Sequence, residues 1–310
     1  MKTIVKFLLA LPLALAPVAA QEAAPKVQDA MARIVITDEG GQTVWITAAS
    51  STNLEYKIVK DSLNRKRTPL SSIESIYFFE PPEFGEAMDL YKNRDYKAAS
   101  EKFAVVKEAF GRIDELPGNF SALSSFYILE CARRSKDLEG LAALVADYRT
   151  GLVVREDHLQ QEEIYVLWDA IRTKAWTRAN TISSEMLEQK KWTSSQLAQI
   201  FYCQGLALEG LERPTDALIA LNSVLSADFT ASHELVPDAA LACFRIIDGM
   251  EEVDLARKLF GTEDENRNST GHRLLEEAAA LVELWDAAFG AGQPLPENYK
   301  EFLKYKGKGI

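Results

Sequence analysis

The feature that most constrains this chain is a recurring pair of short amphipathic helical patterns joined by a tight break. In residues 201–225, apolar side chains return every three or four positions on both sides of a break at residues 211–214, which is the pattern of two helices folded back on each other. Gly205 and Ala217 are small and fall where we expect the two helices to approach closely. Aligned on the residue that opens the pattern, the pair recurs five times, at Ala87, Leu129, Leu167, Gly205 and Phe244.

The spacing of the five pairs predicts a stack of hairpins rather than a single compact core. Successive starting residues are 42, 38, 38 and 39 positions apart, and a regular step of about 40 residues is the signature of a helical solenoid. Each pair has one more apolar face than it can cover by itself, so it folds only against its neighbours. We therefore expect a mainly α protein (α+β overall) with five helical hairpins over residues 83–261. Residues 262–310 should form a C-terminal cap with one long amphipathic helix and a tail.

The helical pairs resemble tetratricopeptide repeats. In the first pair, Ala87, Leu90, Ala99 and Phe103 fall at positions where that family has small and apolar residues, and the pair around Gly205 matches equally well. The other three pairs keep the apolar spacing without the small residue on the first helix, and the step exceeds the length of about 34 residues typical of the family. The order of parts also resembles a poorly characterised group of exported bacterial repeat proteins.

An export signal is predicted ahead of the folded part. Residues 1–20 combine a short basic start, an apolar stretch over residues 7–16 and small residues up to Ala20, after which we expect cleavage. The apolar stretch is too short to span a bilayer and is interrupted by proline. Residues 21–31 should be a flexible leader. We expect the mature chain in the periplasm, or elsewhere in the cell envelope or outside the cell of a bacterium.

Residues 32–80 predict a small β module. Residues 33–37 and 43–47 are β-branched runs on either side of a hairpin turn signal. Residues 54–59 alternate apolar and polar, and residues 67–79 give one or two further strands. So many short strands in so few residues predict a bent sheet or a small barrel. The segment PLSSIESIYF at the end of this module is similar to the last strands of Sm-like small barrels.

Charge and cysteine content limit the partners and the chemistry. The formal net charge is −11 and becomes −13 once the two lysines of the export signal are removed. An acidic chain gains no counterion-release affinity for nucleic acid, so we expect no such partner. Cys131, Cys203 and Cys243 are odd in number and lack metal-site spacing, which indicates buried thiols, although a bond between Cys203 and Cys243 stays open. Asn119 and Asn268 open glycosylation sequons.

No pattern of a known catalytic or cofactor site is present. The sequence has no GxSxG, HExxH, phosphate loop or dinucleotide fingerprint, and acidic pairs such as Glu162 and Glu163 fall on polar helix faces. Residues 264–275 lack the glycine and the final glutamate of a calcium loop. We therefore expect no enzyme, no metal and no cofactor. The alternative is an envelope glycan or peptide hydrolase with a site between the β module and the first hairpins.

The resemblance to tetratricopeptide repeats implies a binding groove. In that family the first helices of successive hairpins line a concave surface, and aromatic and arginine side chains are frequent anchors at interfaces. We therefore predict a scaffold or adaptor that binds another protein or an extended peptide. Because the implied set is more basic than acidic, that partner should carry carboxylates. A purely structural assembly subunit is the other alternative. The groove residues are Phe84, Tyr91, Lys92, Phe126, Arg133, Arg134, Trp168, Arg172, Tyr202, Glu209 and Arg245.

Overall fold

The structure is a computed structural model that describes residues 27–227, 234–290 and 292–307. The predicted export signal over residues 1–20 therefore lies outside the described residues. An antiparallel sheet comes first and helices packed in sequential pairs follow, so the expected mainly α fold is confirmed.

The sheet confirms the predicted β module. Its strands are β1 (Ala30–Ile36), β2 (Gly40–Ala49), β3 (Asn53–Lys57), β4 (Lys66–Pro69) and β5 (Ile73–Phe78), in the spatial order β4-β3-β2-β1-β5. The boundary of the leader was wrong, because β1 begins at Ala30. Ala30, Ala32, Ile34 and Ile36 alternate along the buried face of this strand, and two of these four positions are alanines rather than the β-branched residues from which the strand was predicted.

The connection between β4 and β5 requires this sheet to bend. The two strands form opposite edges of an open five-stranded sheet, yet only the 3₁₀ turn η1 (Leu70–Ser72) joins them. Four strand spacings of a flat sheet would separate the edges by about 19 Å, whereas four residues of extended chain reach about 14 Å at most. The edges must therefore curl toward each other. Of the two predicted forms, the structure has the bent open sheet.

The five predicted helical hairpins are all present. In chain order they are α1 (Pro82–Lys92) with α2 (Tyr96–Ala109), α3 (Phe120–Arg134) with α4 (Leu138–Ala146), α5 (Glu156–Arg172) with α6 (Trp176–Glu188), α7 (Ser194–Gly210) with α8 (Pro214–Ala227), and α9 (Leu235–Asp248) with α10 (Glu251–Leu259).

The first four hairpins share one turn geometry. The second residue after the first helix adopts a left-handed conformation at Arg94, Lys136, Lys174 and Glu212, with φ between 54° and 64°. The next backbone N–H then donates to the carbonyl five residues earlier, at 2.8–3.0 Å in all four turns, which is the bond that ends many helices. These four positions are 42, 38 and 38 residues apart, so the turns repeat the step that defined the hairpins.

Close approach of the paired helices explains the small residues noted in the sequence. A Cβ added at Gly205 would lie 2.6 Å from Leu221 Cγ, which no side chain tolerates without movement. Ala217, on the opposite helix, is fully buried. The predicted contact between α7 and α8 through these residues is therefore confirmed.

The predicted cap closes the C-terminal end. The helix α11 (Thr270–Ala288) buries Leu274, Leu275 and Trp285 among other side chains. After it, α12 (Glu297–Lys300) and the 3₁₀ helix η3 (Glu301–Tyr305) lie on the last hairpin, where the Tyr299 ring stacks on Phe244 with centroids 5.0 Å apart.

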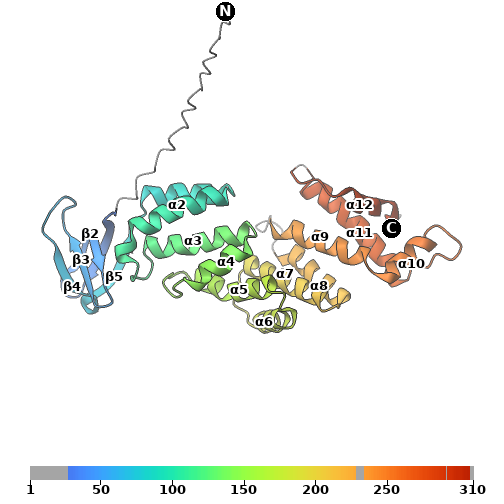
Figure 1. The fold of residues 1–310 in the computed structure, drawn as a ribbon, viewed down its shortest axis with the longest axis horizontal. Helices are drawn as coiled ribbons and strands as arrows, with labels where there is room; N and C mark the ends of the chain where they lie inside the picture. Colours follow the sequence, from blue (N-terminus) through green and yellow to red (C-terminus); the bar gives the residue numbers. More distant parts are fainter. Residues whose placement is uncertain (1–26, 228–233, 291, 308–310) are drawn as a thin grey trace, which may run out of the picture.

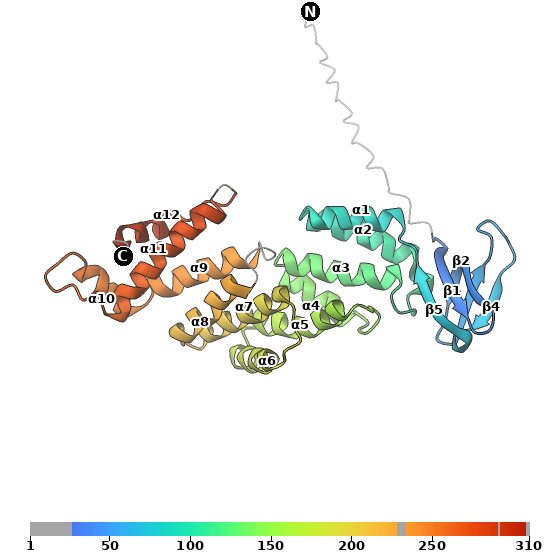
Figure 2. The same ribbon diagram turned by 180° about the vertical axis from the view of Figure 1, so that it is seen from behind.

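The helical pairs form an arch with the sheet at one end (Figures 1 and 2). In both views, α2 near one end and α12 near the other rise on the same side of the row. We call this the inner side; α3 and α9 lie nearer to it, and α6 lies on the outer side.

Two apolar cores meet at α3. The first combines the sheet interior with Phe84, Phe103 and other residues of the first hairpin, so the space between the sheet and the first hairpin is filled by buried side chains. The second runs from the second hairpin to the C-terminal cap. The helix α3 belongs to both, since it contributes Phe120 and Cys131 to the first core and Leu129 to the second.

Burial also answers questions that the sequence left open. Cys131, Cys203 and Cys243 are free and buried, as the interpretation of buried thiols predicted. Asn119 is fully buried and caps α3 by accepting hydrogen bonds from two backbone N–H groups, so this sequon is closed to a glycan in the folded chain. Within the described ranges, no helix has the length and apolarity needed to cross a bilayer.

We expect Lys174→Gly to raise the free energy of unfolding by about 0.5–1 kcal/mol, because glycine adopts the left-handed turn conformation without a Cβ clash. Chemical denaturation should measure this change. Ala104→Gly, at an exposed position in the interior of α2, should lower it by about 1 kcal/mol. A loss of stability in both variants would contradict the role assigned to the turn.

Candidate functional site on the inner side of the arch

Residues from four successive hairpins line a small pocket. Its volume is about 120 Å³, on the scale of the ~150 Å³ cavity that holds benzene in an engineered protein, so one apolar side chain would fill it. Apolar and charged side chains both line it, and of the charged ones Arg133 is buried while Arg134, Lys136, Glu234 and Asp238 are partly exposed and form the rim. The lining residues are Arg133 and Arg134 on α3, Lys136 and Leu138 after it, Trp168 and Ile171 on α5, Tyr202 and Leu206 on α7, and Glu234, Leu235 and Asp238 at the start of α9.

A buried ion pair supports the α3 side of the pocket. Arg133 donates two hydrogen bonds to Glu130, at 2.8 and 2.7 Å, and the Tyr165 hydroxyl on α5 donates a third to the same carboxylate at 3.0 Å. Burial by itself would raise the pKa of Glu130, but the two neighbouring arginines and these hydrogen bonds overcome it and hold the pKa at about 2. Glu130 is therefore charged in the folded chain, and it fixes Arg133 in place.

Contacts distant in sequence close the other side of the pocket. Arg134 lies 3.5 Å from the Glu234 carboxylate and its guanidinium lies over the Tyr91 ring, 5.2 Å from the centroid. The Tyr96 hydroxyl also donates to Glu234. These bonds join the first two hairpins to the start of α9, which lies 138 residues after Tyr96 and 100 residues after Arg134, so the pocket depends on the curvature of the whole stack.

The structure brings together only part of the predicted groove. Arg133, Arg134, Trp168 and Tyr202 line the pocket, and Tyr91 contacts Arg134. Tyr91 itself and the other predicted groove residues are not part of the lining: Phe84, Lys92, Phe126, Arg172, Glu209 and Arg245.

Several predicted groove residues are core rather than contact surface. Phe84 packs among aromatic rings of the first core, and Phe126 stacks on His158 with ring centroids 4.4 Å apart. Both are at most 5% exposed. Trp168 is also buried and donates its indole N–H to Gln199 at 3.1 Å, so only part of it faces the pocket. Phe84, Phe126 and Trp168 therefore pack between hairpins, although the resemblance to tetratricopeptide repeats had assigned them to partner binding.

The cations of the predicted groove do not form a free basic surface. Arg133 pairs with Glu130, and Arg134 with Glu234. The remaining ones are also paired, as is Lys136 at the rim: Lys92 with Asp89, Arg172 with Asp169 and Glu139, Arg245 with Glu209, and Lys136 with Asp238. Each positive charge that implied an acidic partner therefore already has a carboxylate beside it.

Sequence reasoning missed the acidic half of the rim. Glu234 and Asp238 lie before and within α9, outside the positions carried over from the repeat family. One signal was present: aligned on the repeat step, Asp238 occupies the position of Gln161 and Gln199, which bond each other's amides at 3.0 and 2.8 Å in the buried α5–α7 contact. Asp238 is thus a carboxylate where the two preceding hairpins have a buried amide, and it pairs with Lys136 instead of with a neighbouring amide.

The charged side chains that line the pocket all have ion-pair partners. Burial raises the pKa of the Tyr202 hydroxyl, and His158 lies outside the pocket, where burial lowers the pKa of the imidazole. Among the described residues, no three His, Cys, Asp or Glu side chains group so as to hold a metal ion. The geometry offers an apolar cavity with fixed charges around it.

Comparison of the chain with protein-family models, with curated proteins and with solved structures gave no match.

The Glu130 pair predicts acid sensitivity. The folded-state pKa lies below the ordinary 4.5, so this stabilisation is complete above about pH 5 and is lost as the pH falls toward 2; a shift of this size corresponds to about 3 kcal/mol. Urea unfolding at a series of pH values should show the loss. The double variant Glu130→Met/Arg133→Met removes both charges. In this variant the free energy of unfolding should fall less steeply between pH 5 and pH 2 than in the wild type. An unchanged slope would contradict the assignment.

Proposed function

We propose that the chain is a non-catalytic scaffold, tetratricopeptide-like in architecture, that binds an extended segment of another protein on the inner side of the arch. The observation that carries this proposal is the pocket itself. Four successive hairpins contribute to it, and its apolar interior has room for one side chain. A groove built from repeated first helices is the surface that helical solenoids offer to partners.

The apolar interior defines the anchor of the partner. Ile171, Tyr202, Leu206 and Leu235 surround the cavity, so an aliphatic or aromatic side chain of the partner would gain most from entering it. The paired rim charges leave no net attraction for an acidic segment. Specificity would come from the shape of the cavity and from hydrogen bonds to groups such as Asp238.

Export remains part of this proposal. The pattern of residues 1–20 supports it, and the burial of all three thiols suits a chain that functions in an oxidising compartment.

Peptide selection followed by matched substitution tests the proposal. Random peptides displayed on phage would be selected on the wild-type chain, synthesised, and measured by calorimetry. Leu206→Glu should weaken their binding at least about tenfold, because a charge in the apolar cavity costs desolvation energy. Trp168→Ala is unsuitable, because Trp168 is buried and its loss would leave a cavity in the core and remove a hydrogen bond to Gln199.

Leu255→Glu is the matched control, because Leu255 lies on α10 and is 58% exposed. It should leave the binding of the same peptides unchanged. Circular dichroism of both variants would verify the fold. Selected peptides that bind Leu206→Glu as well as the wild type would overturn the inner pocket as the binding site.

A further inference from the structure

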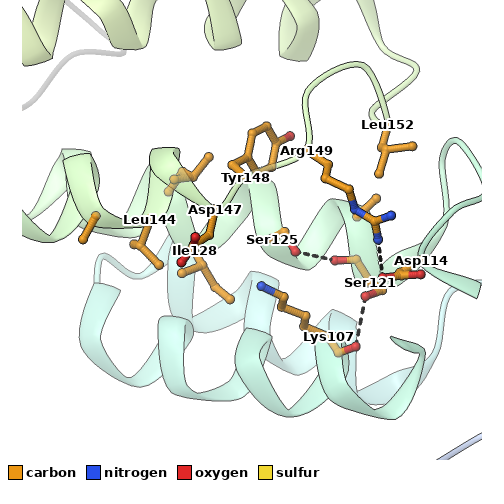
Figure 3. Close-up of a pocket in the computed structure, with 13 residues that line it drawn as sticks. Lys107, Asp114, Ser121, Ser125, Ile128, Leu144, Asp147, Tyr148, Arg149 and Leu152 are labelled. Atoms are coloured by element: carbon orange, nitrogen blue, oxygen red, sulfur yellow. Dashed lines mark hydrogen bonds and ion pairs between the residues drawn. The ribbon is translucent and has the colours of Figure 1, made fainter. Parts of the chain in front are cut away.

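A second pocket lies on the opposite side of α3. Its volume is about 410 Å³, within the range of about 300–1,000 Å³ usual for small-molecule sites. It is bounded by the end of α2, the middle of α3, the end of α4 and the loop that follows α4 (Figure 3). Ser125 in this pocket and Arg134 in the inner pocket are nine positions apart, which is about half a rotation around the helix. The two pockets therefore use different faces of α3.

Most polar groups of this second pocket are already bonded to protein. Ser121 Oγ donates to the Lys107 carbonyl at 3.0 Å, and Ser125 Oγ donates to the Ser121 carbonyl at 2.9 Å. Arg149 pairs with Asp114, as Figure 3 shows. The Tyr148 hydroxyl donates to Glu162 at 2.6 Å, outside the pocket. These bonds fix the walls and leave few groups for a ligand.

Two oppositely charged side chains of this pocket differ from its other polar groups in their bonding. The Lys107 ammonium and the Asp147 carboxylate both line it, and neither makes a hydrogen bond or an ion pair within the part of the chain that the structure describes. Figure 3 shows both side chains on the same side of the pocket, with Ile128 close by and Leu144 beyond it. Leu144 is 37% exposed, although it belongs to an apolar helix. The pocket thus combines one free cation and one free anion with an aliphatic floor.

We propose that this pocket binds a small aliphatic zwitterion of the size of a dipeptide. The ligand carboxylate would lie on Lys107, its ammonium on Asp147, and its aliphatic side chains over Ile128 and Leu144. Charge complementarity at both ends selects a free amino acid or dipeptide over a segment within a polypeptide, which carries neither terminal charge. The volume favours the dipeptide over a single amino acid. This site is independent of the partner pocket on the inner side.

Calorimetric titration with leucyl-leucine tests the proposal. Saturable binding is expected, and it should weaken about tenfold in Lys107→Met and about tenfold in Asp147→Asn, since each removes one charge-assisted contact. Blocking one end of the ligand, as in N-acetyl-leucyl-leucine or leucyl-leucinamide, should have the same effect on the wild type. Lys97→Met, at an exposed position of α2 outside the pocket, is the matched control and should bind as the wild type does.

The outcomes separate this site from the inner pocket. Leu206→Glu should leave leucyl-leucine binding unchanged. Absence of saturable heat at millimolar leucyl-leucine would overturn the proposal. Equal affinity for the doubly blocked N-acetyl-leucyl-leucinamide would also overturn it, because the apolar floor alone would then account for the binding.

Discussion

The mutual covering of apolar helix faces is the constraint on which this structure depends. A pair of short helices buries one side of each helix within the hairpin and leaves another side open. The next hairpin covers that side, and the close approach at Gly205 and Leu221 shows how tightly the helices must pack. The two ends of the row need other elements. The bent sheet covers the first hairpin, and α11 with η3 covers the last.

Within this apolar stack, the buried Glu130–Arg133 pair has a separate role. An ion pair in a core gains little over apolar side chains of the same volume, because both charges lose their hydration. We infer that its contribution is orientation. Bonded to each other and to Tyr165 on the next hairpin, these groups hold α3 at a defined rotation relative to α5. That rotation is what directs Arg134 toward Glu234.

The parts of the fold that could be predicted are those that depend on local pattern. The step between Ala87 and its four equivalents located the hairpins, and the small residues on α7 and α8 located a close contact. These signals are local because a helix exposes the same face every three or four residues. The sheet was recognisable from its β-branched runs, except where Ala30 and Ala32 carry the strand.

The candidate site was less predictable because it depends on distances that no local pattern contains. Whether Tyr202 faces a pocket or a neighbouring helix depends on the curvature of the stack, which is a sum of small rotations over all hairpins. The contact of Tyr96 with Glu234 is a result of that sum. Burial of charge was also unpredictable, since the sequence did not show that each groove arginine would meet a carboxylate.

The helix α3 has one further consequence for the mechanics of the molecule. Its residues belong to two apolar cores, one on the sheet side and one on the cap side, so each half of the chain is packed as a block and the seam between them runs along a single helix. A bend of the arch at α3 would move the sheet and the first hairpin as one block and the hairpins beyond it as the other, and it would have to break the bonds of Tyr165 to Glu130 and of Arg134 to Glu234.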